Sequence, residues 1–383
     1  MRDVFIGGVG MTIFGKHPDR SLRDLGREAC LNTIRESGIN PKEIEAGYCG
    51  NALAPVLQGE TGVGQNVLWE IGINRVPIVN VENACASGST ALREGWMAVA
   101  GGFYNMVIVV GVEKVVMPKG TMLNVGAAEL ETRLGDVFPG YFALVAQKHM
   151  ERYGTTREQL AQVSVKNHLS GILNPYAQFR KKFSLDEVLN SPMIADPLTL
   201  YSCCPNSDGA AAVILCSKEK ARNLDISPVK ITASVLTTGT YENRQDITCW
   251  EVEKQAAKEA YNMASLAPED LDVVEVHDAF TICEIVHYED LGLCPPGEGG
   301  RLLDEGATEL GGRIPVNPSG GLLSKGHPVG ASGVGQVVEI AWHLRGQAGE
   351  RQVENARVGL AQIMGGSKEA DTRACTVHIL VRE

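Results

Sequence analysis

The stretch Val76-Pro77-Ile78-Val79-Asn80-Val81, followed by Asn83-Ala84-Cys85-Ala86-Ser87-Gly88-Ser89, decides the fold class. The first part is rich in β-branched residues and predicts a strand. The second part opens a helix of small side chains that we expect to run from about Ser87 to Ala100. A strand that leads into a buried helix is the repeating unit of α/β proteins.

The same alternation of strand and helix continues on both sides of this stretch. A strand followed by a glycine turn is expected at 4–10, and an amphipathic helix over 21–37, where Ser21 and Asp24 form a capping box. Met106 to Gly111 is a continuous apolar run, typical of a strand buried on both faces. The pattern therefore predicts an α/β fold with a layered sheet.

The chain divides into two halves of similar rhythm, which suggests an internal duplication. We expect an N-terminal half over 1–228 and a C-terminal half over 229–383. Between about 115 and 205, helix-like segments joined by Asn, Pro and Ser turns replace the alternation, so this stretch is interpreted as an inserted helical subdomain.

Composition excludes several classes of protein. The 383 residues carry a net charge of −11 without a Lys/Arg run, which argues against binding to nucleic acid or to an anionic membrane. The longest apolar run, Met106 to Val112, is too short to span a bilayer. Ten cysteines without C-x-x-C spacing, and no apolar leader, favour free thiols in a reducing cytoplasm.

Cys85 is the first candidate for chemistry. A thiol at a helix N-terminus experiences the positive end of the helix dipole, so we expect a lowered thiol pKa there. Its small neighbours leave room for an acyl group, and nearby backbone N–H groups can face an oxyanion. The alternative is a buried cysteine that only packs the start of the helix.

Two histidines are the other candidates. His327 lies in a loop crowded with Gly and Pro, where an imidazole could take a thiol proton; a plain surface histidine is the alternative. His277 follows the strand predicted over 271–276 and could donate to a carbonyl oxygen, although a helix-capping role is the simpler interpretation. Cys203 and Cys204 are interpreted as structural, and no metal-ligand spacing is present.

Three motifs together resemble the thiolase superfamily: Asn83 to Gly88, His277-Asp278-Ala279-Phe280, and Gly326-His327-Pro328-Val329-Gly330-Ala331-Ser332-Gly333. Ser207-Asp208-Gly209-Ala210-Ala211 and Ile363-Met364-Gly365-Gly366 extend the resemblance over the whole chain. The His-Asp-x-Phe motif is similar to that of the sterol-carrier-protein-type and archaeal branch.

The resemblance implies a fold and an assembly. It implies a thiolase fold with duplicated five-layered α-β-α-β-α halves, an inserted loop domain, and a homodimer or a dimer of dimers. Coenzyme A would be a substrate and product, with no tightly bound cofactor and no metal.

The resemblance also implies roles for particular residues. Cys85 would be the acyl-accepting nucleophile and His327 its base. His277 would help to hold the thioester oxygen of a second acyl-CoA. The backbone at Cys85 and at the Gly365-Gly366 turn would form an oxyanion hole, and Ser324 and Gly326 would contact coenzyme A.

One departure concerns the second cysteine that thiolases use for proton transfer at the acyl-CoA α-carbon. Ile363 occupies its place in the common branch, and Ala279 its place in the sterol-carrier type. Cys283 is a weak substitute by position; water, a substrate carboxylate or His327 are alternatives. Several thiolases of this branch with His-Asp-Ala-Phe work beside a small zinc-ribbon/OB-fold protein that helps to bind coenzyme A. The resemblance, together with the acidic chain and the missing second cysteine, therefore implies such a partner here.

The leading hypothesis is cleavage of a 3-oxoacyl-CoA with coenzyme A, or the reverse condensation, in lipid or aromatic catabolism. Two acyl groups are open under this hypothesis: a bulky or aromatic one, as in 2-benzoylsuccinyl-CoA, and the acetyl group of an acetoacetyl-CoA thiolase (acetyl-CoA C-acetyltransferase). Rival hypotheses are a condensing synthase of the same superfamily, a non-catalytic CoA-binding scaffold subunit and, least favoured, a cysteine hydrolase.

Overall fold

The computed structural model describes residues 1–115, 130–240, 246–368 and 371–383. The N-terminal half contributes a sheet in the order β3-β2-β4-β7-β1. Its strands are β1 (Val4–Met11), β2 (Ala46–Gly50), β3 (Ile78–Val81), β4 (Met106–Glu113) and β7 (Gly209–Ser217). The prediction of a doubly buried strand is confirmed, because every residue of β4 is buried.

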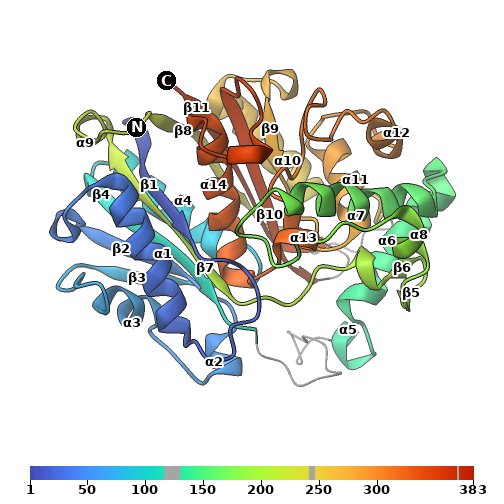
Figure 1. Cartoon of the computed structure of the whole chain (residues 1–383), viewed down its shortest axis with the longest axis horizontal. Coiled ribbons are helices and arrows are strands. Elements are labelled where there is room, and N and C mark those ends of the chain that lie inside the picture. Colours follow the sequence, from blue (N-terminus) through green and yellow to red (C-terminus); the bar gives the residue numbers. More distant parts are fainter. Residues whose placement is uncertain (116–129, 241–245, 369–370) are drawn as a thin grey trace.

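The C-terminal half contributes the strands β8 (Val229–Thr237), β11 (Asp371–Arg382), β10 (Val358–Lys368) and β9 (Val273–Glu275), paired in that order. β10 and β11 form a closing antiparallel hairpin. A short pairing of Phe5 and Ile6 with Lys230 and Val229 connects the two sheets. The two chain ends therefore lie near one another, at the top of Figure 1.

Helices divide this assembly into five layers (Figure 1). α1 (Leu22–Ser37) and α3 (Val63–Trp69) cover the outer face of the first sheet, and α10 (Glu251–Ala264) and α11 (Thr281–Asp290) cover the second. α4 (Ser87–Ala100) and α14 (Val329–Arg345) lie in the middle, where α14 packs against both sheets.

The α/β thiolase-type architecture is thus confirmed, with one difference in how the layers are shared. We expected five layers in each half, whereas each half supplies one sheet, one outer helix layer and one central helix. The physical reason is that a sheet has two apolar faces, and the inner faces of both sheets are covered by the same pair of central helices.

The inserted segment is helical, as its sequence pattern predicts. It contains α5 (Leu130–Arg133), α6 (Phe138–Tyr153), α7 (Arg157–Ile172) and α8 (Leu185–Leu189), with the short strands β5 (Met193–Ala195) and β6 (Leu198–Thr199). Part of the predicted insertion, residues 116–129, lies outside the described residues. The division of the chain at residue 228 stays a prediction.

The remaining elements are short connections. They are the helices α2 (Ala54–Leu57), α9 (Lys218–Ala221), α12 (Gly299–Asp304) and α13 (Gly321–Lys325), and single 3-10 turns at Pro41–Glu43, Leu200–Ser202, Pro268–Asp270 and Gly349–Arg351. The expected capping box of α1 is present, since Ser21 Oγ accepts the N–H of Asp24 and the Asp24 carboxylate accepts the N–H of Ser21.

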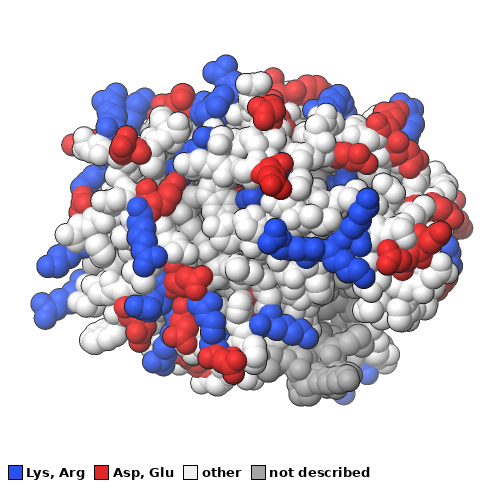
Figure 2. Space-filling model, in the orientation of Figure 1, with Lys and Arg blue, Asp and Glu red and all other residues white. Residues whose placement is uncertain are grey.

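Surface charge and apolar length add two observations. On the face drawn in Figure 2, acidic and basic side chains are mostly interspersed, with one cluster of basic side chains right of centre. Within the described residues, none of the helices has the length and apolar character needed to cross a membrane.

The centre of the molecule is a close contact between backbones. A Cβ atom at Gly88, in the first turn of α4, would lie 2.3 Å from the carbonyl oxygen of Gly330 in the first turn of α14. A Cβ at Gly111, at the end of β4, would lie 2.4 Å from the same oxygen. Only glycine permits this approach, which brings the starts of the two central helices together.

Replacing Gly88 therefore tests the central contact. We expect Gly88→Ala to lower the free energy of unfolding by about 1–3 kcal/mol, the usual cost of overpacking a tight core. Urea denaturation measures the change, with Gly15→Ala as the matched control because a Cβ at Gly15 meets no atom within 4 Å. Equal stability of the two variants would contradict the structural role of the contact.

Candidate functional site

Cys85 lies in the tight turn between β3 and α4. The preceding residue, Ala84, has φ = 47°, a left-handed conformation that costs a non-glycine residue about 1 kcal/mol or more. Two bonds hold the turn: Ser87 Oγ donates to the Ala84 carbonyl (2.6 Å), and the Asn83 N–H donates to Ser87 Oγ (2.9 Å). The strained turn presents the Cys85 thiol at the start of the central helix.

His327 lies next to this thiol, with 3.4 Å between its Nε2 and Cys85 Sγ. Its Nδ1 is 2.8 Å from Ser332 Oγ, and that hydroxyl donates its own hydrogen to the Pro328 carbonyl (3.0 Å). The hydroxyl has only one hydrogen, so it must accept the Nδ1–H of His327. Nε2 is then the unprotonated nitrogen and can accept the thiol proton of Cys85.

His277 completes a cluster with these two residues. Its ring centroid is 5.3 Å from that of His327, and the residue is only 5% exposed. Neither ring nitrogen has a hydrogen-bond partner within the described structure. Its backbone is fixed at both ends, since its N–H donates to Gln362 Oε1 (3.0 Å) and its carbonyl accepts from His287 Nε2 (3.0 Å). Such a buried, unpaired imidazole is poised to bind a polar atom of a ligand.

Burial decides the charge state of the cluster. It raises the pKa of the Cys85 thiol to about 12, although the backbone N–H groups of Gly366 and Cys85 oppose the shift. It lowers the pKa of His327 to about 4, and burial together with His327 and His287 lowers the pKa of His277 well below its usual value. The lowered thiol pKa expected from the helix position is therefore wrong: the free site holds a neutral thiol and neutral imidazoles.

The three side chains line one end of a cavity of about 360 Å³. Its walls are mostly apolar and come from three parts of the chain: the insertion, the turn after β3 and the C-terminal half. Phe142 of α6 stacks on Phe280 at 4.7 Å and meets Trp250 edge-on at 6.3 Å. The cavity wall therefore combines the Cys85 thiol, two histidines and aromatic side chains.

The Gly365-Gly366 turn of β10 approaches this thiol from the other side. The Gly366 N–H is directed at the Cys85 sulfur. A Cβ at Gly365 would lie 2.1 Å from the Asn83 carbonyl, so the close approach requires a glycine. The backbone N–H groups of Cys85 and Gly366 thus both act on the Cys85 sulfur; the oxyanion hole expected there stays a prediction.

Buried carboxylates hold the two loops that carry the histidines. Glu113 accepts the N–H groups of Gly330 (3.0 Å) and Ala52 (2.9 Å), which fixes the start of α14 just after His327. Asp278 accepts the N–H of Leu322 (2.6 Å) and so attaches α13 to the residue that follows His277. Burial raises the pKa of both carboxyls to about 7.

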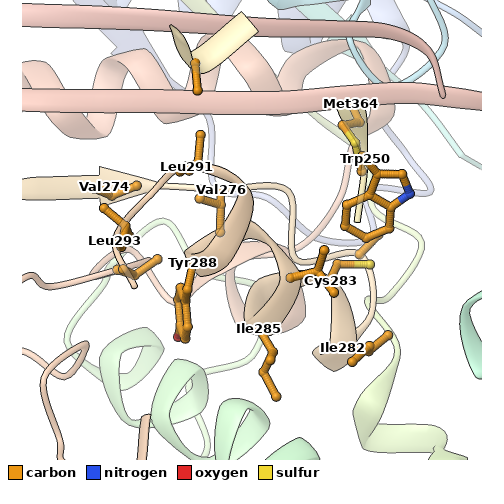
Figure 3. Close-up of a cluster of buried hydrophobic side chains, with 14 of the residues drawn as sticks. Trp250, Val274, Val276, Ile282, Cys283, Ile285, Tyr288, Leu291, Leu293 and Met364 are labelled. Carbon is orange, nitrogen blue, oxygen red and sulfur yellow. The ribbon is translucent and has the colours of Figure 1, made fainter. Parts of the chain in front are cut away.

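Three predicted residues are placed elsewhere. Cys283 is completely buried in the core cluster around Trp250 and Tyr288 (Figure 3) and does not line the described cavity wall. The prediction that Ser324 and Gly326 contact coenzyme A stays a prediction. Ser324 is fully buried and donates to the Phe179 carbonyl (2.7 Å), and a Cβ at Gly326 would meet Ser207 Oγ at 2.5 Å.

Two features of the site were not predicted from the sequence. Ser332, quoted only as part of a motif, orients His327; its position five residues later, in the first turn of a helix, is a signal that could have identified it. Cys203 and Cys204, interpreted as structural, line the cavity. Their place depends on a bridge to Phe280 that has no sequence signal.

The same cluster has the composition of a metal site. The donor atoms of Cys85, His277 and His327 all lie within 4.8 Å of one another, and thiolate with imidazole suits zinc. The 3.4 Å contact between Sγ and Nε2 is already a hydrogen bond in the ligand-free protein. The absence of a functional metal stays a prediction.

Comparison with known proteins gives a consistent result. The family described as "Thiolase, N-terminal domain" matches residues 4–219, and "Thiolase C-terminal domain-like" matches 233–380. The acetyl-CoA acetyltransferase of Methanothermobacter thermautotrophicus is 46% identical over the whole of both chains. The benzoylsuccinyl-CoA thiolase subunit BbsB of Thauera aromatica is 40% identical over 96% of each chain.

Solved structures show the same fold. The Ltp2-ChsH2(DUF35) aldolase superposes with a TM-score of 0.86 at 24% identity, covering 99% of this chain and 98% of that one. The Acat5 thiolase from Ascaris suum, solved in complex with coenzyme A, superposes with a TM-score of 0.74 at 19% identity over the whole of both chains.

The raised thiol pKa has a measurable consequence. Alkylation by iodoacetamide requires the thiolate, so we expect the rate at Cys85 to rise with pH up to and beyond pH 9 without a plateau. Peptide mass spectrometry separates Cys85 from the other cysteines. A plateau below pH 7 would instead indicate a thiolate–imidazolium pair, and His327→Asn is the control that would abolish such a pair.

Proposed function

We propose, since this chain belongs to the thiolase family and is an acyltransferase, that it cleaves a 3-oxoacyl-CoA with coenzyme A through an acyl group carried on Cys85. The observation that carries the proposal is the 3.4 Å contact between Cys85 Sγ and the unprotonated Nε2 of His327, at the end of an apolar cavity. The same residues would catalyse the reverse condensation.

In the first step, the Cys85 proton moves to His327 Nε2 as sulfur attacks the keto carbon. This timing is required because the free pair is neutral, so the thiolate forms only in the presence of substrate. The negative charge on the keto oxygen is held by the N–H groups of Cys85 and Gly366. The bond between C2 and C3 then breaks, leaving the acyl group on Cys85 and an acetyl-CoA enolate.

The enolate oxygen is the polar atom that His277 would bind. Its two unpaired ring nitrogens supply a neutral donor, and the newly protonated His327 supplies a charged one. A donor that gains strength as the enolate forms lowers the barrier to carbon–carbon cleavage. Coenzyme A then attacks the acyl-Cys85 thioester, and the thiol is restored.

The acyl group is proposed to be bulky or aromatic. Phe142, Phe280 and Trp250 provide stacking surfaces in the cavity, and a relative of similar size is a benzoylsuccinyl-CoA thiolase subunit. A second candidate is an acetoacetyl-CoA thiolase, which the 46% identical acetyl-CoA acetyltransferase favours. Both use the same cysteine and differ only in the acyl group.

Intact-protein mass spectrometry after exposure to separate 3-oxoacyl-CoAs tests the function and the acyl group together. We expect one added acyl mass, mapped to Cys85, and none in Cys85→Ser, because an alcohol is a far weaker nucleophile at neutral pH. A benzoyl adduct would support the aromatic substrate, and an acetyl adduct alone would support acetoacetyl-CoA. A Cys85→Ser enzyme with full turnover would refute the proposal.

Single histidine variants separate the two half-reactions. We expect His327→Ala to slow acylation of Cys85 by roughly 10²–10⁴-fold, the usual contribution of an acid–base group. His277→Ala should leave acetylation by acetyl-CoA nearly unchanged while slowing carbon–carbon cleavage by a similar factor. Rapid-quench measurement of both steps gives the comparison, and equal effects on both steps in His277→Ala would make that residue a structural support.

We also propose a dimer with a partner protein, in a reducing compartment. β3 is an edge strand with half-exposed Val79, which leaves its backbone open to pairing with a second copy.

BbsB is named as a subunit, and the Ltp2 structure contains a second component, ChsH2(DUF35). All ten cysteines are free thiols, which fits the cytoplasm. Light scattering of the pure chain measures the dimer, and low-salt co-purification tests for the partner.

A further inference from the structure

The proposed reaction requires a proton at C2 that Cys85, His277 and His327 do not supply. When the C2–C3 bond breaks, its electron pair becomes the enolate, and C2 must then take a proton. Cys85 is acylated at this stage, and the histidine N–H groups hold the enolate oxygen. Ala279 and Ile363 carry no transferable proton, and Cys283 is sealed in the core.

A second thiol lies in the same cavity. Cys204 lines the wall that also contains Cys85, His277, Ala279 and His327. The Cys204 N–H donates to the Ala279 carbonyl (2.9 Å), and Cys203 pairs with Phe280 as an antiparallel bridge. The backbone of Cys204 therefore runs directly beside that of Ala279, and both residues line the same cavity.

The neighbouring Cys203 has a different environment. It also lines the cavity, but its Sγ donates to the Thr199 carbonyl at 3.4 Å, within its own loop. The imidazole of His277 is unpaired and 95% buried, so it marks the place where an oxygen atom of a ligand would bind. His277 and Cys204 line the same cavity. The two cysteines thus form a natural pair of test and control positions.

We propose that Cys204 is the catalytic acid and base of the α-carbon, an inference that rests on the proposed function. In cleavage, the Cys204 S–H bond breaks, its proton forms a C–H bond at C2, and acetyl-CoA leaves. The Cys204 thiolate then takes the proton of the coenzyme A thiol, and the resulting CoA thiolate attacks acyl-Cys85. His327 returns its proton to the released Cys85, so the cycle closes without net change.

The surroundings of Cys204 keep it in the acid form that this step needs. Burial, and the nearby groups Cys203, Asp278, Cys85 and Cys283, raise the pKa of the Cys204 thiol well above its ordinary value. A protonated thiol is therefore ready when the enolate appears, and the thiolate that remains is a strong base for the coenzyme A proton.

Deuterium exchange into the methyl group of acetyl-CoA, followed by NMR in D₂O, measures this proton transfer alone. We expect Cys204→Ala to slow exchange by about 10²-fold or more, while acetylation of Cys85 stays within threefold of the wild-type rate. Cys203→Ala should exchange normally. In the double variant Cys204→Ala/Ala279→Cys, exchange should be at least tenfold faster than in Cys204→Ala alone, because a thiol is returned to the same part of the cavity.

The controls separate the possible failures. Serine has nearly the same volume as cysteine, but its hydroxyl is a far weaker acid than a thiol. Cys204→Ser therefore serves as the test variant if Cys204→Ala does not fold. Deuterium exchange at the wild-type rate in Cys204→Ser would overturn the assignment. Loss of exchange in Tyr141→Phe, with Cys204 intact, would overturn it as well, because Tyr141 lines the same cavity. A wild-type protein that is never acylated at Cys85 would instead refute the proposed function.

Discussion

The rest of the site depends on the contact between the starts of α4 and α14. Gly88 allows the backbone of α4 to touch the Gly330 carbonyl of α14, where a Cβ atom at position 88 would hold the two helices apart. Cys85 lies just before the first of these helices and His327 just before the second, so the distance between thiol and imidazole is set by backbone packing. The contact is buried at the centre of five layers and is therefore rigid.

Burial gives this site its chemistry as well as its shape. The dipole of a helix stabilises a nearby charge by about 1 kcal/mol, whereas complete burial shifts a pKa by several units. Desolvation therefore wins at Cys85 and His327, and the resting pair carries no charge. In the proposed mechanism, charge appears only when a substrate brings its own polar atoms to the Gly366 N–H and to His277, so proton transfer is coupled to binding.

The cavity is assembled from parts that are distant in sequence. Cys85 comes from the N-terminal half, both histidines come from the C-terminal half, and the insertion contributes Phe138 and Phe142 to the aromatic wall. The loop that follows the insertion brings Cys204 beside Ala279. Neither half contains the complete set of groups, so the proposed chemistry is a property of the whole chain.

The sequence by itself determined the alternation of strands and helices, the helical character of the insertion and the choice of the three side chains that the fold brings together. These depend on local periodicity and on residue type, which are readable along the chain. The tertiary structure alone decided the neutral state of the thiol, the orientation of His327 by Ser332, the removal of Cys283 to the core and the place of Cys204 in the cavity. Each of these depends on burial and on contacts between residues far apart in the sequence, and neither quantity exists until the two sheets close on their shared central helices.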